Sequence, residues 1–143
     1  MGDHWLAGHV EGFNFDSYNL GIVYAFAEVV AAGCKRLALS APLSPEEYAR
    51  LRKPIEHIAK ENGVIVQADD DFLVTRLFNP AFTEGKTVVH IVRDRSVFDE
   101  YQRLKALKKS KRPGVEEEVA RGLGRLLSYD EGTIEELLKK PKF

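Results

Sequence analysis

Apolar residues recur every three or four positions along much of the chain, which is the spacing of helices with one buried face. This pattern predicts helices over 17–33 and 45–62. The second begins with a strong start signal, because Ser44 can cap the helix and Glu47 occupies the capping-box position. Pro54 lies inside this helix and removes one backbone donor, so we expect a kink or a break there.

Short apolar runs between the helical segments predict strands. Residues 36–40 form one candidate, residues 64–66 are all β-branched, and residues 87–92 read TVVHIV. Residues 72–78 fit either another extended segment or a short helix. Because 64–66 and 87–92 are continuously apolar, we expect these strands to be covered on both faces.

The last third of the chain reads as helical. A stripe of apolar residues runs from about Ser96 to Lys109, a basic linker follows, and two shorter stripes come after it. We therefore divide the chain into an α/β domain over 1–109 and a C-terminal helical extension over 110–143. The extension packs on the same domain or on a partner subunit, and its apolar faces favour a homo-oligomer.

Strands that alternate with helices are typical of α/β proteins. We expect a small, largely parallel sheet of three or four strands with flanking helices and a C-terminal α-hairpin. The carboxyl ends of parallel strands share one edge of a sheet, and ligands usually bind outside that edge. The loops over 40–44, from 69 onward and over 93–96 would then converge.

Composition narrows the classes of protein to consider. The chain has 143 residues, enough for one substantial core, and its net charge of −1 predicts no general affinity for nucleic acid or membranes. No apolar stretch reaches the ~18 residues of a membrane span, and the N-terminus is not a secretory signal, so we expect a cytoplasmic location and no membrane partner. Few amides, one cysteine and abundant mixed charge are typical of thermophiles.

One segment near the C-terminus carries a resemblance. The sequence GRLLSYDEGTIEELL, residues 124–138, resembles the closing segments of small uncharacterised archaeal proteins. The segment is a small part of the chain, and the resemblance implies an archaeal source but no activity.

Three consecutive aspartates, Asp69, Asp70 and Asp71, follow the strand predicted at 64–66. In extended chain Asp69 and Asp71 share a face, and two close carboxylates can bind Mg²⁺ and so polarise a phosphoryl group. They are the candidate catalytic and metal-binding residues of a metal-dependent phosphoester hydrolase. The alternatives are ion pairs with Arg76 or Arg93, or a turn in which the aspartates bond local amides. We favour the turn.

A second candidate is an anion site at the predicted sheet edge. Ser44 heads a helix, Ser40 ends a strand, and Arg93 and Arg95 can supply charge and bidentate hydrogen bonds to a phosphate-like ligand. In the alternative interpretation, Ser44 only caps its helix and the two arginines pair with neighbouring aspartates on the surface.

A third candidate is the basic segment over 103–112, which could bind a nucleic-acid backbone through counterion release. We favour this hypothesis less, because cations also stabilise a helix C-terminus and the segment lacks interleaved aromatic residues for stacking. The candidate nucleic-acid contacts are Lys105, Lys108, Lys109, Lys111 and Arg112.

The other residues that could bind a metal or a ligand give weaker signals. His4 and His9 are five residues apart, which is not the spacing of a helical metal pair, and we expect His90 to be a half-buried sheet residue. The aromatic and amide-rich residues 11–19 either line a pocket or interface, or anchor a loop in the core. There is no cofactor fingerprint, so the preferred hypothesis is a self-associating α/β protein that binds a small anion, with catalysis left open.

Overall fold

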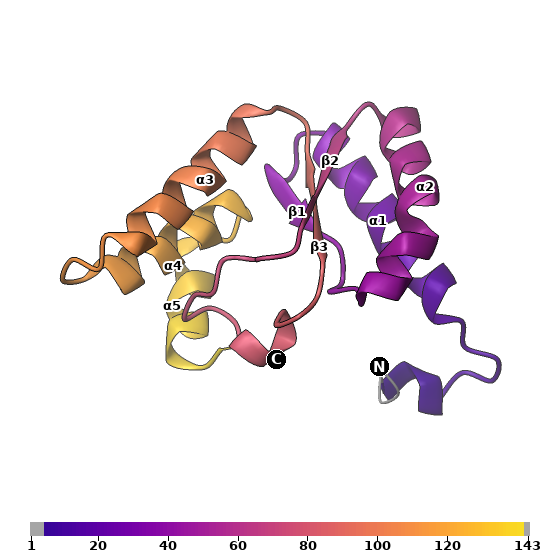
Figure 1. Cartoon of the computed structure of the whole chain (residues 1–143), viewed down its shortest axis with the longest axis horizontal. Helices are drawn as coiled ribbons and strands as arrows, with labels where there is room; N and C mark the ends of the chain where they lie inside the picture. The colour runs from indigo at the N-terminus through magenta and orange to yellow at the C-terminus, as the bar shows by residue number, and fades with distance from the viewer. Residues whose placement is uncertain (1–4, 142–143) are drawn as a thin grey trace.

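A three-stranded sheet lies between two layers of helices (Figure 1). The protein is described by a computed structural model over residues 5–141. In chain order its elements are η1 Trp5–Gly8, α1 Phe15–Ala31, β1 Leu37–Leu39, α2 Pro45–Asn62, β2 Ile65–Asp69, η2 Pro80–Phe82, β3 Val88–Val92, α3 Ser96–Lys109, α4 Val115–Leu126 and α5 Glu131–Lys139. The mixed helix and sheet composition agrees with the sequence pattern.

The sheet is antiparallel, so the expectation of a largely parallel sheet is wrong. The strand order is β1-β3-β2, and β3 runs antiparallel to both neighbours. The helix α2 returns the chain so that β1 and β2 point the same way. The connection from β2 to β3 contains only the short η2, so the chain enters β3 in the opposite direction between the other two strands.

Helices cover both faces of the central strand. Val88 and Val92 point to the layer of α3, α4 and α5, whereas Val89 and Ile91 point to the layer of α1 and α2. All five residues of β3 are buried for this reason. A continuously apolar strand therefore marks a sheet covered on both sides, and the direction of its neighbours does not follow from it.

Local signals in the sequence explain where α2 begins and ends. The Ser44 hydroxyl accepts a hydrogen bond from the Glu47 N–H at 3.1 Å, and the Glu47 carboxylate accepts one from the Ser44 N–H at 2.9 Å. Gly63 ends the helix at a φ of 70°, which is a left-handed conformation that glycine adopts without a Cβ clash. Pro54 does not break the helix, which continues to Asn62.

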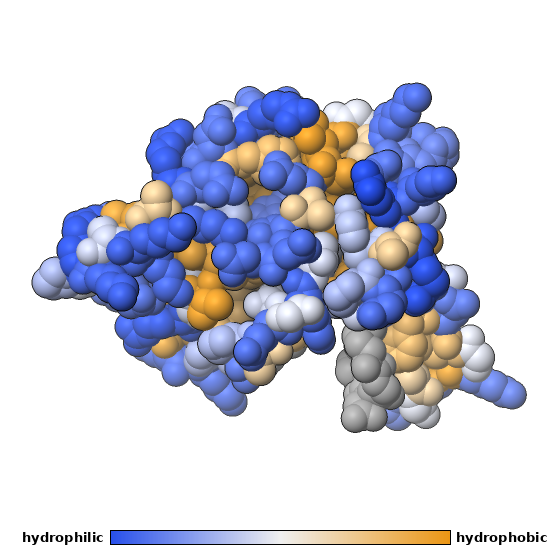
Figure 2. Space-filling model, viewed as in Figure 1, coloured by the Kyte–Doolittle hydropathy of each residue, from blue (hydrophilic) through white to orange (hydrophobic). Residues whose placement is uncertain are grey.

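The C-terminal helices complete the core of this same chain. Val119, Leu123 and Ile134 are buried together with Leu37 and Val92 of the sheet. Their apolar faces, which suggested self-association, are covered by the sheet and by α3. Hydrophobic residues show in Figure 2 only as separate patches among hydrophilic ones.

The packing of α4 on α5 depends on a glycine. A Cβ atom on Gly124 would lie 2.7 Å from Cγ1 of Ile134, which is fully buried and cannot move aside. We predict that Gly124→Ala lowers the free energy of unfolding, because overpacking of about 1–3 kcal/mol exceeds the gain in helix propensity of about 1 kcal/mol.

The matched control for this change is Gly21→Ala in α1, where nothing lies within 4 Å of the added Cβ. This variant gains helix propensity alone and should be more stable than the parent by up to about 1 kcal/mol. Urea unfolding measures both differences. Equal stabilisation by the two changes would contradict the close packing of α4 on α5.

Candidate functional site

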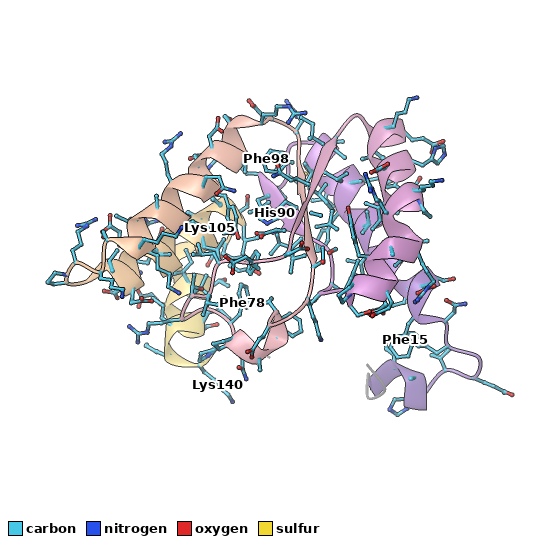
Figure 3. All side chains as sticks on the ribbon, viewed as in Figure 1. Phe15, Phe78, His90, Phe98, Lys105 and Lys140 are labelled. Atoms are coloured by element: carbon cyan, nitrogen blue, oxygen red, sulfur yellow. The ribbon has the colours of Figure 1, made fainter. Side chains whose placement is uncertain are left out.

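Four polar side chains meet between the sheet and α3, and we call them the Asp69 cluster: Asp69, His90, Tyr101 and Lys105. Asp69 is the last residue of β2, and its register with β3 puts it diagonally next to His90 on one face of the sheet. Tyr101 and Lys105 are four residues apart on α3, so they share a helix face. Figure 3 shows His90 and Lys105 in the space between the sheet and α3.

Both oxygens of the Asp69 carboxylate have polar partners. Its Oδ2 lies 2.9 Å from Nε2 of His90 and accepts a hydrogen bond from the Tyr101 hydroxyl at 2.5 Å. Its Oδ1 accepts a hydrogen bond from the Asp71 N–H at 2.9 Å and lies 3.3 Å from the Lys105 ammonium. The Asp69 side chain is only 12% exposed, so these contacts replace most of its hydration.

Tyr101 extends the cluster to the chain that follows β2. Its hydroxyl oxygen accepts a hydrogen bond from the buried Leu73 N–H at 2.8 Å while it donates to Asp69. The loop after β2 is therefore held to α3 through one phenol group. This contact satisfies a backbone donor that would otherwise be buried without a partner.

These contacts shift two pKa values in opposite directions. Burial opposes ionisation of Asp69, but the hydrogen bonds from His90, Tyr101 and the Asp71 amide, with the charge of Lys105, outweigh burial and hold its pKa well below the usual value. Burial, followed by the hydrogen bond to the Asp69 carboxylate, raises the pKa of Tyr101 far above its usual value. Asp69 is therefore a partly buried anion, and Tyr101 is a neutral donor.

The ring of His90 is enclosed by aromatic side chains. Its centroid lies 4.4 Å from that of Tyr101, 5.8 Å from that of Phe72 and 6.3 Å from that of Phe98. The Nδ1 atom is buried and has no hydrogen-bond partner among the described residues. A histidine–carboxylate pair can act as a general base only where a substrate can reach it, and His90 is 2% exposed.

The aspartate triplet forms a turn, the arrangement that the sequence analysis favours. Asp69 accepts the N–H of Asp71 within its own turn, and Asp70 accepts a hydrogen bond from the Thr87 hydroxyl at 2.7 Å. The Asp71 side chain is exposed. Within residues 5–141, no group of three or more His, Cys, Asp or Glu side chains is placed to hold a metal ion. The Asp69 carboxylate is bonded within its turn and to its cluster partners, and the hydrolase hypothesis for Asp69 and Asp71 stays a prediction.

The predicted anion edge does not assemble. Ser44 is occupied by its capping box, and the Ser40 hydroxyl donates to Ala41 O at 2.8 Å and accepts from the Val89 N–H at 2.9 Å. Arg93 donates to Ala31 O at 3.3 Å, and Arg95 is exposed at the start of α3. Since β3 is antiparallel, its carboxyl end lies at the opposite end of the sheet from Ser40.

The basic segment over 103–112 is divided between structural contacts and solvent. Lys105 pairs with Asp69, Lys108 donates to the Val74 carbonyl, and Arg112 pairs with Glu118 at 2.7 Å. Lys109 and Lys111 are exposed. Three of the five candidate cations therefore make contacts within the chain, and nucleic-acid binding by this segment stays a prediction.

A groove that the sequence did not indicate lies between residues 74–80 and the C-terminal helices. It has a volume of about 660 Å³, with Val74, Phe78 and Leu138 among its apolar lining and Arg76 and Glu116 among its polar lining. None of the Asp69 cluster lines it.

A second hollow of about 380 Å³ shares Arg76 and Glu116 with the groove and also includes Lys111 and Arg112. The sequence analysis offers Arg76 only as an ion-pair partner of the aspartates. The dipeptide Asn79-Pro80 is a sequence signal for a turn in this loop, but it does not indicate a groove.

The aromatic segment over 11–19 leads into α1. Asn14 caps the helix by accepting the Ser17 N–H at 2.9 Å. The Phe13 ring packs on Phe15 with centroids 4.8 Å apart. His4 lies outside the described residues.

Comparison of the chain with family models, curated proteins and solved structures finds no match. Among the described helices, none has both the length and the apolar character needed to cross a membrane. The cytoplasmic location, the thermophilic source and the archaeal resemblance of residues 124–138 stay predictions. The geometry described above is therefore the basis for any function.

The low pKa of Asp69 generates a pH prediction. The folded-state pKa lies below the unfolded value of about 3.9, so the ionised carboxylate stabilises the fold above about pH 4, and this stability is lost as the pH falls toward the folded-state pKa. We predict that Asp69→Asn lowers the free energy of unfolding at pH 7 by about 3 kcal/mol. Urea unfolding across pH 2–7 should show this difference shrinking below about pH 4.

The control is Asp71→Asn, which changes an exposed carboxylate in the same turn. We expect its effect to stay within about 0.5 kcal/mol at every pH. A large effect of Asp71→Asn, or a pH-independent effect of Asp69→Asn, would contradict the assignment of the buried anion to Asp69.

Proposed function

We propose that this protein is a ligand-binding domain that takes a small anion with an apolar body in the groove over residues 74–80. The observation that carries this proposal is the position of Arg76, which lines both the apolar groove and the second hollow, where Lys111 and Arg112 also lie. Phosphate and carboxylate groups match the planar fork of an arginine, and an apolar body would displace water from Phe78 and Leu138.

The size of the groove suits such a ligand. Small-molecule sites are typically about 300–1,000 Å³ and combine an apolar lining with few polar groups. The groove, at about 660 Å³, combines the side chains of Phe78 and Pro80 with the polar groups of Thr75 and Asn79. The preferred sequence hypothesis of a small anionic ligand is kept, but its location moves from the sheet edge to this groove.

The charges around the groove favour a ligand with one anionic group. Arg76 and Lys111 make no ion pair with another described residue, so they are available to a ligand. The carboxylates of Glu116 and Glu117 also border the basic hollow and reduce its net charge. A polyanion such as a nucleic acid gains less from this arrangement than a single phosphate group does.

The Asp69 cluster holds in place the loop that forms one wall of the groove. The loop that forms one wall is fixed by the hydrogen bond from Leu73 to Tyr101 and by the bond from Lys108 to the Val74 carbonyl. A loop that is already held in its bound position loses less conformational entropy when the ligand binds. The buried polar residues therefore serve binding by positioning the loop.

The test uses phenyl phosphate as the probe, because it joins an aromatic body to one phosphate group. We predict that phenyl phosphate raises Tm and shifts the NMR signals of residues 74–80, and that Arg76→Gln weakens binding about tenfold. Inorganic phosphate and phenol alone should each bind more weakly than the combined molecule.

The matched control is Arg103→Gln, which removes an exposed arginine of α3 that does not line the groove. This variant should bind phenyl phosphate with the parent affinity. Equal loss of binding in both variants would show a general charge effect, and the absence of any signal shift at residues 74–80 would contradict the groove as the site.

A further inference from the structure

The outer side of β2 carries backbone groups that are not bonded within the described chain. Ser40 N–H donates to Val89 O at 2.9 Å, so Val89 and, by alternation, Ile91 direct their backbone groups toward β1. Val88, His90 and Val92 therefore direct theirs toward β2.

The partners of these residues on β2 are fixed by the register. Asp69, Gln67 and Ile65 pair with Val88, His90 and Val92, so their backbone groups point inward to β3. Val66 and Ala68 consequently direct their N–H and C=O groups outward, and no described backbone or side-chain group bonds to them. We call these outward groups the β2 edge.

The β2 edge lacks the protection that edge strands usually have. Natural proteins cover such strands or place charges and prolines in them. Here the middle of the strand is Val66-Gln67-Ala68, without charge or proline, and Gln67 and Ala68 are exposed. Figure 1 shows β2 between α2 on one side and α3 on the other, and among the described residues no strand pairs with its outer side.

Charge at the two ends of β2 determines which partner fits. The exposed Asp70 and Asp71 follow its carboxyl end, and Lys60, at the end of α2, precedes its amino end. Lys60 makes no ion pair with another described residue. If β2 of a second copy pairs in antiparallel orientation, the acidic end of each strand lies beside the basic end of the other. If it pairs in parallel orientation, the two acidic ends lie beside each other and repel.

We propose that the β2 edge pairs with the β2 edge of a second copy of this chain, in antiparallel orientation about a two-fold axis at Gln67. In this register Val66 of one copy exchanges backbone hydrogen bonds with Ala68 of the other, and the two Gln67 residues lie directly opposite. The pairing satisfies the outward groups and joins two three-stranded sheets into one of six strands. It is independent of the ligand groove, because no residue of β2 lines that groove.

Cysteine cross-linking tests the register directly. Directly opposed residues of a non-hydrogen-bonded pair have Cα atoms about 4.5 Å apart, within the range for a disulfide. In a Cys34→Ser background, which removes the natural exposed cysteine, Gln67→Cys should form a covalent dimer under mild oxidation. The matched control Ala68→Cys lies opposite Val66 rather than itself, and should cross-link much less.

A second variant tests the backbone pairing without a reagent. Proline is tolerated on an edge strand where the N–H faces solvent, so Ala68→Pro should preserve the monomer fold and remove an outward donor. Sedimentation should show the parent at twice its chain mass of 16.1 kDa and Ala68→Pro at the monomer mass, while Ala68→Ser stays dimeric. Circular dichroism confirms that each variant is folded.

Charge exchange tests the orientation. Asp71→Lys should weaken the dimer, and adding Lys60→Glu to it should restore the dimer, because the two ends again carry opposite charges. A parent protein that stays monomeric at high concentration would overturn the proposal. Preferential cross-linking of Ala68→Cys, or a dimer that survives Ala68→Pro, would overturn it equally, because the copies would then meet in another register or through another surface.

Discussion

The other features depend on the hydrogen bonds that the partly buried carboxylate of Asp69 accepts. One anion accepts hydrogen bonds from its own turn and from α3, and it contacts an imidazole of β3. Burying a carboxylate is costly unless its oxygens are satisfied. The need to satisfy them fixes the end of β2, the start of the following loop and the rotation of α3 over the sheet at the same time.

This arrangement connects the fold to the proposed binding groove. The chain that leaves Asp69 is anchored at Leu73 by Tyr101 and then forms the wall that carries Arg76. A histidine beside an aspartate resembles part of a catalytic site, but aromatic rings enclose it and neither hollow reaches it. In the proposed function, the Asp69 cluster holds a loop in place through Tyr101, and residues further along that loop bind the ligand.

Local sequence signals predicted most of the helices and strands, but they did not predict how these elements pair and pack. The capping box at Ser44 and the stripe that became α4 depend on neighbours within one turn, so they could be read directly. The parallel sheet was predicted from strands that alternate with helices, but the connection from β2 to β3 contains only η2, so β3 runs in the opposite direction. The convergence of Ser40 with Arg93 failed for this reason, because it assumed that all strands end on one side.

The candidate site was predicted in part. Asp69 was singled out and the turn was favoured, but its partners His90, Tyr101 and Lys105 are 21 to 36 residues away. Contacts at such separations are set by the register of β2 on β3 and by the packing of α3. The spacing of apolar residues in one sequence predicts neither the register nor the packing. The groove was missed because its lining comes from a loop and two helix ends, which show no common pattern.

Amide hydrogen exchange at Leu73 tests the central claim most directly, because this N–H reports whether the loop is held by the Asp69 cluster. If it is, Leu73 exchanges as slowly as the buried amides of β3, and Tyr101→Phe accelerates its exchange far more than theirs. Exchange of Leu73 in the parent protein at the rate of an open loop, unchanged by Tyr101→Phe, would contradict the account.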